Sequence, residues 1–360
     1  MNFYFPLDIF DGNYKAYQLD SLTHIALGAC IGEIMLSKKL GKKAMLWGAL
    51  AQSFPDVDFI ASFLLSPTAD LNAHRSLTHS FLFALLMAIC LSLLARRLHR
   101  PHNIAFKTFF IFFGLQMGIH DVLDTCNAYG TALFEPFSHH RFAFNILYVI
   151  DPFFSITLLI AATALIIAKR FSRLRTTWLL FGLLPSAFYL GYSALNKLKV
   201  DRKIEQSLNV SQVKYKDYFT TPTPFNNLLW YCVAASDSGY YIGYRSVFDN
   251  SQTYTRFRFF KRNDQLIKPG EKDDLKQLLR FAGDYYTIEQ NKDTLIFNVL
   301  RFGQVLGWQN PEGHFAFHYF LNEGYDNSLV VQRGRFTGWN RKTLHIFYRR
   351  IIGSIEKQQE

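Results

Sequence analysis

The first half of the chain is dominated by Leu, Ile, Phe and Ala, and this apolar character ends at about Leu195. The residues that follow are polar, with charges, Gln, Asn and Tyr throughout. The mean hydropathy near zero is therefore an average over two unlike halves. This division predicts an N-terminal all-α membrane helical bundle, residues 1–199, followed by a C-terminal α+β soluble domain, residues 200–360.

About six stretches of the first half are long or apolar enough to be transmembrane helices, although several fall short of the ~20 residues that a span needs. A soluble helical bundle with these residues in its core is the alternative. A cleaved signal peptide is not expected, because Met1–Leu19 has no basic region followed by an apolar run. The six stretches are Ser21–Leu36, Ala44–Leu65, Ser80–Ala95, Ile104–Cys126, Leu147–Ala168 and Thr176–Leu195.

Positive charge is concentrated in every second connection between these stretches. Basic connections flank membrane helices on the cytoplasmic side. We therefore expect a multi-pass protein of the cell (inner) membrane, with both termini and the polar half toward the outer face. The same loops account for much of the net charge of +11, so a nucleic-acid partner is not expected. The three clusters are Lys38, Lys39, Lys42 and Lys43; Arg96, Arg97, Arg100 and Lys107; and Lys169, Arg170, Arg173 and Arg175.

Histidines and aspartates occur in four short packets beside or inside the apolar stretches. At ~1.5 Å per residue, Lys43 to Asp56 and Lys107 to His120 each span about 20 Å. The other packets lie roughly 22–25 Å from their basic loops. In a hydrocarbon core ~30 Å thick, all four reach one level just below the outer interface. Such side chains are expensive at membrane depth and mark functional sites. The metal-ligand candidates are His24, Asp56, Asp58, His74, His79, His120 and Asp124.

The spacing within the packets favours a metal centre. His120 and Asp124 are four residues apart and share one face of a helix. Asp56 and Asp58 cannot both point the same way on a straight helix, so Pro55 is expected to kink it. Mixed imidazole and carboxylate ligands suit a divalent metal, best Zn2+, with manganese or iron as alternatives. The donors exceed one tetrahedral site, which predicts two ions.

Several neighbours are candidates for supporting or catalytic roles. Asp20, Asp121 and Arg141 could form hydrogen bonds to the metal ligands and orient them. Arg75 and Arg141 could bind a substrate phosphate, because guanidinium matches phosphate geometry. An interfacial arginine facing lipid headgroups is the alternative for both. Thr78 or Ser76 is expected to cap the third helix, which would leave His79 in its first turn.

The packets resemble the YdjM family of membrane-bound metal-dependent hydrolases over about Asp20 to Pro152. Their order is more distantly similar to the ligand order of zinc-dependent phospholipase C and P1-type nucleases. The resemblance implies that His24, Asp58, His79, His120 and Asp124 bind metal, with Asp58 as the bridge. Asp58 and Arg75 are the candidate catalytic residues. Asp121 departs from the family, which more often has an apolar residue there, and a third zinc has no clear match. The resembling segments are Asp20-Ser-Leu-Thr-His24, Pro55-Asp-Val-Asp58, His74-Arg-Ser-Leu-Thr-His79-Ser, His120-x-x-x-Asp124, Tyr129-Gly-Thr131 and Pro136-Phe-Ser138.

The polar half has the pattern of a mixed α+β domain. Trp230–Ala235 and Tyr240–Phe248 flank Asp237-Ser-Gly239 and predict a hairpin. Lys272–Tyr285 predicts an amphipathic helix. His314 and His318 share a strand face without nearby carboxylates, so they are expected to be ordinary sheet residues. Further predicted strands are Thr253–Phe260, Thr294–Val299, His314–Leu321 and Leu329–Phe336.

These observations predict a membrane-bound metal-dependent hydrolase that acts on a phosphoester or other ester bond. Its partners would be membrane lipids, and its substrate a phosphoester or a phospholipid-like molecule. The alternative is a non-catalytic membrane metal sensor or transporter. A transporter tends to place its ligands near the membrane midplane. The expected off-centre position favours the enzyme.

Overall fold

The computed structural model describes residues 13–169, 172–250, 252–267, 273–321, 327 and 338–353, with side chains from Ser21 onward. These residues form two compact units. The helical unit comprises Asp20–Leu198 together with Pro224–Asn227. The sheet unit comprises the described residues of Met1–Leu19, of Lys199–Thr223 and of Leu228–Glu360.

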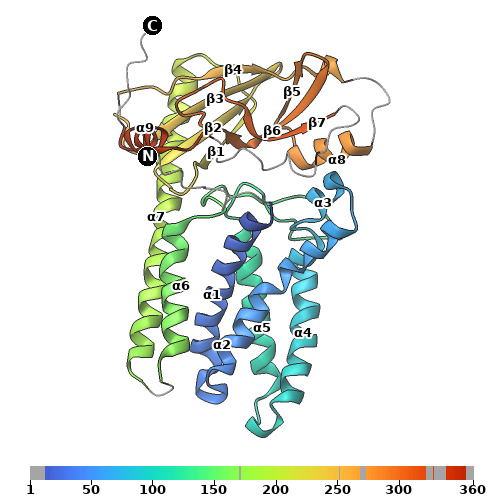
Figure 1. Cartoon of the computed structure of the whole chain (residues 1–360), viewed down its shortest axis with the longest axis vertical. Helices are drawn as coiled ribbons and strands as arrows, with labels where there is room; N and C mark the ends of the chain where they lie inside the picture. The colour runs from blue at the N-terminus through green and yellow to red at the C-terminus, as the bar shows by residue number, and fades with distance from the viewer. Residues whose placement is uncertain are drawn as a thin grey trace, which may run out of the picture. The chain divides into compact units, whose positions relative to one another are not determined.

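Apolar side chains of neighbouring helices form the core of the helical unit, in which the longer helices run side by side (Figure 1). One cluster packs Phe109, Phe112 and Phe113 against small alanines of the preceding helix. A second cluster surrounds Leu158 and Leu165. The helices are α1 (Asn13–Leu40), α2 (Lys43–Ser53), η2 (Pro55–Phe63), α3 (Pro67–Ala73), η3 (Leu77–His79), α4 (Phe81–Leu98), η4 (Arg100–His102), α5 (Phe106–Asp124), α6 (Pro152–Ile167) and α7 (Leu174–Val210).

The expected helix Ala44–Leu65 is interrupted at Pro55, and here the prediction of one segment is wrong. Proline has no backbone N–H and cannot continue the α-helical ladder. The α-helix α2 therefore ends at Ser53, and the tighter 3-10 helix η2 begins at Pro55. The amide of Val57 donates to the carbonyl of Phe54 at 3.3 Å, three residues back.

Two glycines allow α1 and α2 to cross in backbone contact. A Cβ atom on Gly28 would overlap the carbonyl oxygen of Gly48, and one on Gly48 would overlap the carbonyl oxygen of Gly28. Small residues at such crossings are typical of helices that pack closely in membranes. The crossing brings the backbone of α1 within reach of the polar side chains of α2.

Within the described part of the chain, two helices are long and apolar enough to cross a membrane: Phe81–Leu98 and Leu174–Val210. Pro152–Ile167 is a shorter apolar helix. The break at Pro55 shortens α2, and α5 carries Gln116, His120, Asp121 and Asp124, so these helices depart from a purely apolar span. The helical character of the first half is confirmed, and an arrangement with six spans stays a prediction.

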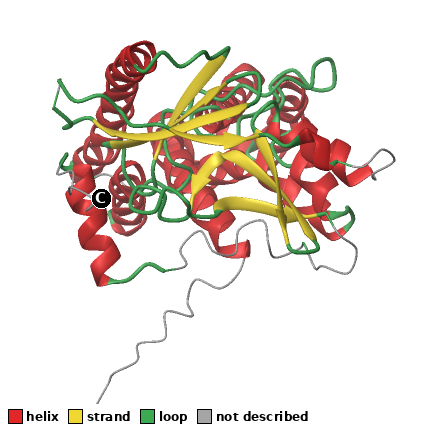
Figure 2. Ribbon diagram, turned by 90° about the horizontal axis from the view of Figure 1, so that it is seen from above, coloured by secondary structure: helices red, strands yellow, loops and turns green. Residues whose placement is uncertain are grey.

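The sheet unit contains two antiparallel sheets (Figure 2). The first has the order β1-β2-β3-β4 and the second β5-β6-β7. The strands are β1 (Asp217–Pro222), β2 (Leu229–Ala235), β3 (Gly239–Ser246), β4 (Arg258–Lys261), β5 (Tyr286–Asn291), β6 (Thr294–Gln304) and β7 (Phe315–Phe320), and the helices are η5 (Asp264–Leu266), α8 (Asp273–Ala282) and α9 (Arg341–Ile351).

The predicted hairpin is confirmed, because β2 pairs with β3 and Ala235 lies opposite Tyr240. The helix α8 confirms the predicted amphipathic helix, and β6 and β7 confirm two of the strands. The strand predicted over Thr253–Phe260 forms only from Arg258 onward, as β4. The strand predicted over Leu329–Phe336 lies outside the described residues. The strands β1 and β5 and the helix α9 had not been predicted.

Candidate metal centre

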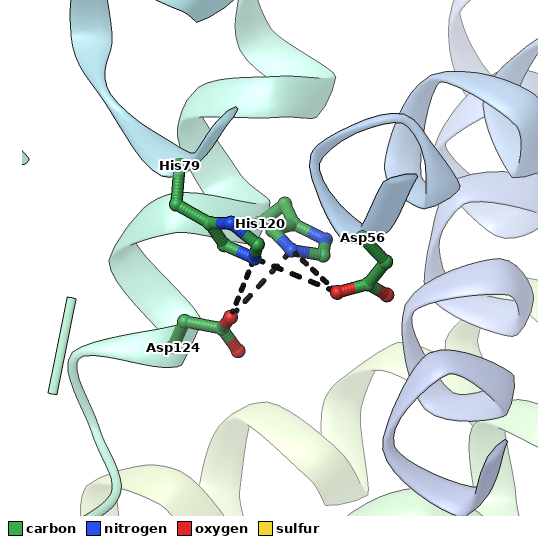
Figure 3. A group of neighbouring side chains, drawn as sticks. All are labelled: Asp56, His79, His120 and Asp124. Carbon is green, nitrogen blue, oxygen red and sulfur yellow. Dashed lines mark ion pairs between the residues drawn. The ribbon is translucent and has the colours of Figure 1, made fainter. Parts of the chain in front are cut away.

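Four side chains from three elements of the helical unit converge on one point (Figure 3). Asp56 comes from η2, His79 from η3, and His120 and Asp124 from the end of α5. One donor atom from each residue lies within 4.8 Å of all the others. Segments that are far apart in the sequence thus supply a single group of two imidazoles and two carboxylates.

The spacing of these donor atoms suits one metal ion. The Nε2 atom of His79 lies 3.3 Å from Oδ2 of Asp124 and 3.5 Å from Oδ1 of Asp56. The Nε2 atom of His120 lies 3.6 Å from each of the same two oxygens. Ligands ~2.0–2.1 Å from a tetrahedral zinc are separated by about 3.3 Å. The four imidazole–carboxylate separations are therefore close to those that a zinc ion requires.

Three of the four donors are buried and lack hydrogen bonds. His79 and His120 are fully buried, and Asp124 is 1% exposed. Within the described structure, neither of the two Nε2 atoms nor Oδ2 of Asp124 has a hydrogen-bond partner. Buried polar atoms in proteins almost always have a partner. A cation held between them would satisfy these atoms together, so the residues fit a metal ion.

Local helix geometry places the ligands. His120 and Asp124 are four residues apart on α5 and share one face, as predicted. In a 3-10 helix two residues that are two apart differ by about 120° in direction. In an α-helix the same two residues would differ by about 160°. The 3-10 geometry of η2 therefore narrows the angle between the directions of Asp56 and Asp58.

The cap of α4 differs from the prediction. Ser80, not Thr78 or Ser76, is the N-cap residue, and its Oγ accepts a hydrogen bond from the amide of Phe83 at 3.2 Å. The residues before it form the turn η3, so His79 precedes α4 and does not lie in its first turn. This turn directs the imidazole of His79 into the cluster.

Asp58 lies behind His79, outside the four-donor group. Its Oδ2 atom accepts a hydrogen bond from the backbone amide of Arg75 at 2.8 Å. The same oxygen lies 3.1 Å from Nδ1 of His74 and 3.5 Å from Nδ1 of His79, which is also 3.1 Å from Oγ1 of Thr78. A carboxylate on the far nitrogen of a ligand histidine fixes the proton there and directs the other nitrogen toward the metal. Asp58 and His74 thus lie beside the four-donor group, and their role as metal ligands stays a prediction.

The two arginines have different surroundings. The side chain of Arg75 is buried, with Nε 3.1 Å from Oδ2 of Asp124, and it lies over the ring of Tyr129. Arg75 also has a positive φ of 54°, which is uncommon for a residue with a side chain. Arg141 donates to the backbone carbonyls of Asn72, His74 and Gly130. Arg75 therefore faces the cluster, and Arg141 ties together the loops that surround it.

His24 reaches the cluster from α1. Its Nε2 atom lies 3.2 Å from Oδ1 of Asp124, and its ring centre is 4.0 Å from that of His120. Asp124 therefore presents one oxygen to the four-donor group and the other to His24.

Three supporting residues were not predicted from the sequence. Ser21 donates to Oδ2 of Asp56 at 2.9 Å, the buried amide of Gln52 lies 3.3 Å from Nδ1 of His24, and Gln52 in turn donates to Gln116. Polar amides in otherwise apolar segments were the signal that could have identified the glutamines. The side chain of Asp20, a predicted supporting residue, lies outside the described side chains.

Carboxylates outnumber guanidinium groups in and beside the cluster. Asp121 is fully buried, and neither of its carboxylate oxygens has a hydrogen-bond partner within the described structure. The guanidinium of Arg75 offsets one negative charge, so with ionised carboxylates and neutral imidazoles the cluster would be anionic. A divalent cation would compensate this charge, because buried charges require partners. The carboxylates are Asp56, Asp58, Asp121 and Asp124.

Comparisons with known proteins agree with a membrane setting. The family described as YdjM inner membrane protein matches residues 19–200. The uncharacterized protein YfhP of Bacillus subtilis (strain 168) is 23% identical over 333 residues, which cover 89% of this chain and 95% of that protein. The inner membrane protein YbcI of Escherichia coli (strain K12) is 27% identical over 123 residues, which cover 34% of this chain and 69% of that protein. No solved structure matches the chain significantly.

Proposed function

Because this chain belongs to the YdjM inner membrane protein family, we propose that it is a membrane-bound hydrolase that cleaves phosphoester bonds at a His/Asp metal centre. The observation that supports the proposal most strongly is the convergence of Asp56, His79, His120 and Asp124 at ligand spacing. The buried donor atoms of His79, His120 and Asp124 lack hydrogen bonds within the described structure, and a cation would satisfy them. Two imidazoles with two carboxylates favour zinc, with manganese as the alternative.

Each residue has a role that follows from its contacts. Asp56, His79, His120 and Asp124 would hold one ion, and His24 with the second oxygen of Asp124 would hold another. Divalent ions in such sites polarise a phosphoryl oxygen and acidify bound water. Asp58 keeps Nε2 of His79 directed at the cluster. Arg75 is placed beside Asp124, where its guanidinium would stabilise negative charge on a phosphoryl group.

The surroundings of the site support a lipid-like substrate. The helix η2 carries Asp56 toward the cluster, while other residues of the same helix are exposed and apolar. An exposed apolar surface beside a polar site suits an amphiphilic molecule, whose acyl chains would lie along it. We therefore propose a phospholipid or a similar phosphoester as substrate. The exposed residues are Phe59, Ile60, Phe63 and Leu64.

Metal binding without catalysis is the second candidate. It is favoured by the burial of His79, His120 and Asp124, which leaves little of the cluster open to a substrate. Asp56 supports catalysis instead, because its side chain is 22% exposed and provides access from one side. The two functions predict different results in one experiment.

That experiment measures hydrolysis by the purified protein in lipid nanodiscs, with a chromogenic phosphodiester and with phospholipids as substrates. We expect zinc-dependent hydrolysis that is abolished by chelation and restored by zinc, with the phospholipid cleaved faster than the soluble ester. His120→Ala should lower the rate by more than the ~100-fold that loss of a supporting partner costs. His102→Ala, which changes a histidine of η4 outside the cluster, serves as the control.

The outcomes separate the candidates. Zinc binding without hydrolysis of either substrate would favour the non-catalytic function. Hydrolysis that survives chelation, or that is equal in His120→Ala and the wild type, would contradict a metal-dependent mechanism. Equal rates on the two substrates would remove the lipid proposal and leave the metal mechanism standing.

A further inference from the structure

Two buried glutamines connect the crossing of α1 and α2 to the metal centre. The side-chain amide of Gln116 donates from Nε2 to the backbone carbonyl of Gly28 at 3.1 Å. Gln52 donates from Nε2 to the backbone carbonyl of Gln116 at 2.8 Å and to its side-chain Oε1 at 3.2 Å. The Oε1 atom of Gln52 then lies 3.3 Å from Nδ1 of His24. Both glutamines are fully buried.

The donors and acceptors in this series of hydrogen bonds follow from the chemistry of the groups. A backbone carbonyl can only accept hydrogen bonds, so the atom of Gln116 that faces Gly28 is its NH2 group. The same rule makes the atom of Gln52 that faces the carbonyl of Gln116 an NH2 group. The remaining atom of the Gln52 amide is its oxygen, which can only accept. The Nδ1 atom of His24 must therefore carry the proton.

We propose that Gln52 and Gln116 act as positioning residues that hold the proton of His24 on Nδ1 and so present the lone pair of Nε2 to the metal centre. The inference rests on the metal-binding part of the proposed function. The inference makes His24 a metal ligand whose ring is oriented by Gln52 of α2.

The contacts on the other side of His24 support this assignment. Its Nε2 atom lies 3.2 Å from Oδ1 of Asp124. With Nδ1 protonated, a neutral imidazole would direct its lone pair at a carboxylate oxygen, and two acceptors repel each other. A proton on Nε2 as well, which makes the ring an imidazolium, or a metal cation beside Nε2 and Asp124 would remove this conflict, and the neighbouring four-donor group supports the metal cation. Ligand histidines almost always donate their other N–H to an oxygen, and here the oxygen is that of Gln52.

The absence of side chains at Gly28 and Gly48, where α1 and α2 cross, leaves room for the hydrogen-bonded glutamines. A Cβ atom on Gly28 would lie 2.7 Å from Cγ of Gln52, and one on Gly48 would lie 2.8 Å from Nε2 of Gln116. Side chains at these positions would therefore displace the glutamines. The close approach of α1 and α2 thus has a consequence for the site as well as for packing.

The test measures zinc affinity of the full-length protein by competition with a chromophoric chelator. Gln52→Leu should lower the affinity 10–100-fold, the usual effect of losing the partner of a ligand histidine. Gln52→Glu should stay within about threefold of the wild type, because its carboxylate still accepts from Nδ1. The same variant should melt at a lower temperature, because glutamate cannot donate to Gln116. Ser92→Ala, which changes a buried polar residue of α4, is the control.

A second measurement separates positioning from packing. In a His24→Ala background, Gln52→Leu should have no further effect on zinc affinity, as a double-mutant cycle would reveal. Selective 15N-histidine spectra should show the Nδ1–H form of His24 in the zinc-loaded wild type.

Three results would overturn the inference. They are an unchanged affinity in Gln52→Leu, an affinity that follows the melting temperature in both Gln52 variants, and an equal loss in the His24→Ala background. Each would leave the proposed hydrolase standing. A wild-type protein that binds no zinc would overturn both proposals, whereas a protein that binds zinc without hydrolysing any substrate would contradict the hydrolase alone.

Discussion

At the scale of single residues, Asp56 and Asp58 have different contacts although they are the same residue type and lie two positions apart. The sequence favoured Asp58 over Asp56 as a ligand, whereas the structure brings Asp56 into the four-donor group and puts Asp58 at Nδ1 of His79. Asp58 is held away from the four-donor group because its Oδ2 atom accepts a hydrogen bond from the amide of Arg75 at 2.8 Å. A backbone donor from a distant loop is not visible in the spacing of an Asp-x-Asp motif.

This difference leads to a prediction for zinc affinity. Asp56→Asn should reduce it more than 100-fold, because a ligand and its charge are lost. Asp58→Asn should reduce it about 10–100-fold, because only the orientation of His79 is weakened. Asp237→Asn, an exposed position in the sheet unit, is the control and should leave the affinity unchanged. A larger loss for Asp58→Asn than for Asp56→Asn would contradict the assignment.

At the scale of secondary-structure elements, the spacing of residues along a helix predicts which of them share a face, but it does not predict how a helix continues after a break. The spacing of His120 and Asp124 predicted one face of a helix, and α5 has that face. Pro55 predicted a kink, but the replacement of α-helix by 3-10 helix depends on which carbonyls accept after the break. Gln52 and Gln116 lie in apolar segments. A hydropathy profile registers them only as less apolar positions and does not indicate what they contact.

At the scale of the whole chain, composition predicted a helical part and a part with sheets, but not every segment of each. Pro224–Asn227 lies in the polar half and yet belongs to the helical unit. The side chain of Asn196, on α7, donates to the carbonyl of Asn227 at 3.1 Å. Composition averages over windows and cannot reveal one loop that packs with the other unit.

The proposed topology also belongs to this scale. The basic loops between helices should face the cytoplasm, and the sheet unit the outer side, because positive loops stay inside. In a variant without native cysteines, Arg100→Cys and Asp237→Cys provide one label position on each side. A membrane-impermeant maleimide should label only Asp237→Cys in right-side-out vesicles and only Arg100→Cys in inverted ones. Labelling of both positions from the same side would contradict the topology.

The central claim is that the His/Asp cluster binds a metal ion. The most direct measurement is the metal content of the purified protein by mass spectrometry, for the wild type and for His120→Ala and Asp124→Ala. We predict at least one zinc per chain in the wild type and a near-complete loss in both variants, with all three proteins still in the membrane fraction. A wild-type protein without metal, or variants that retain as much as the wild type, would contradict the account.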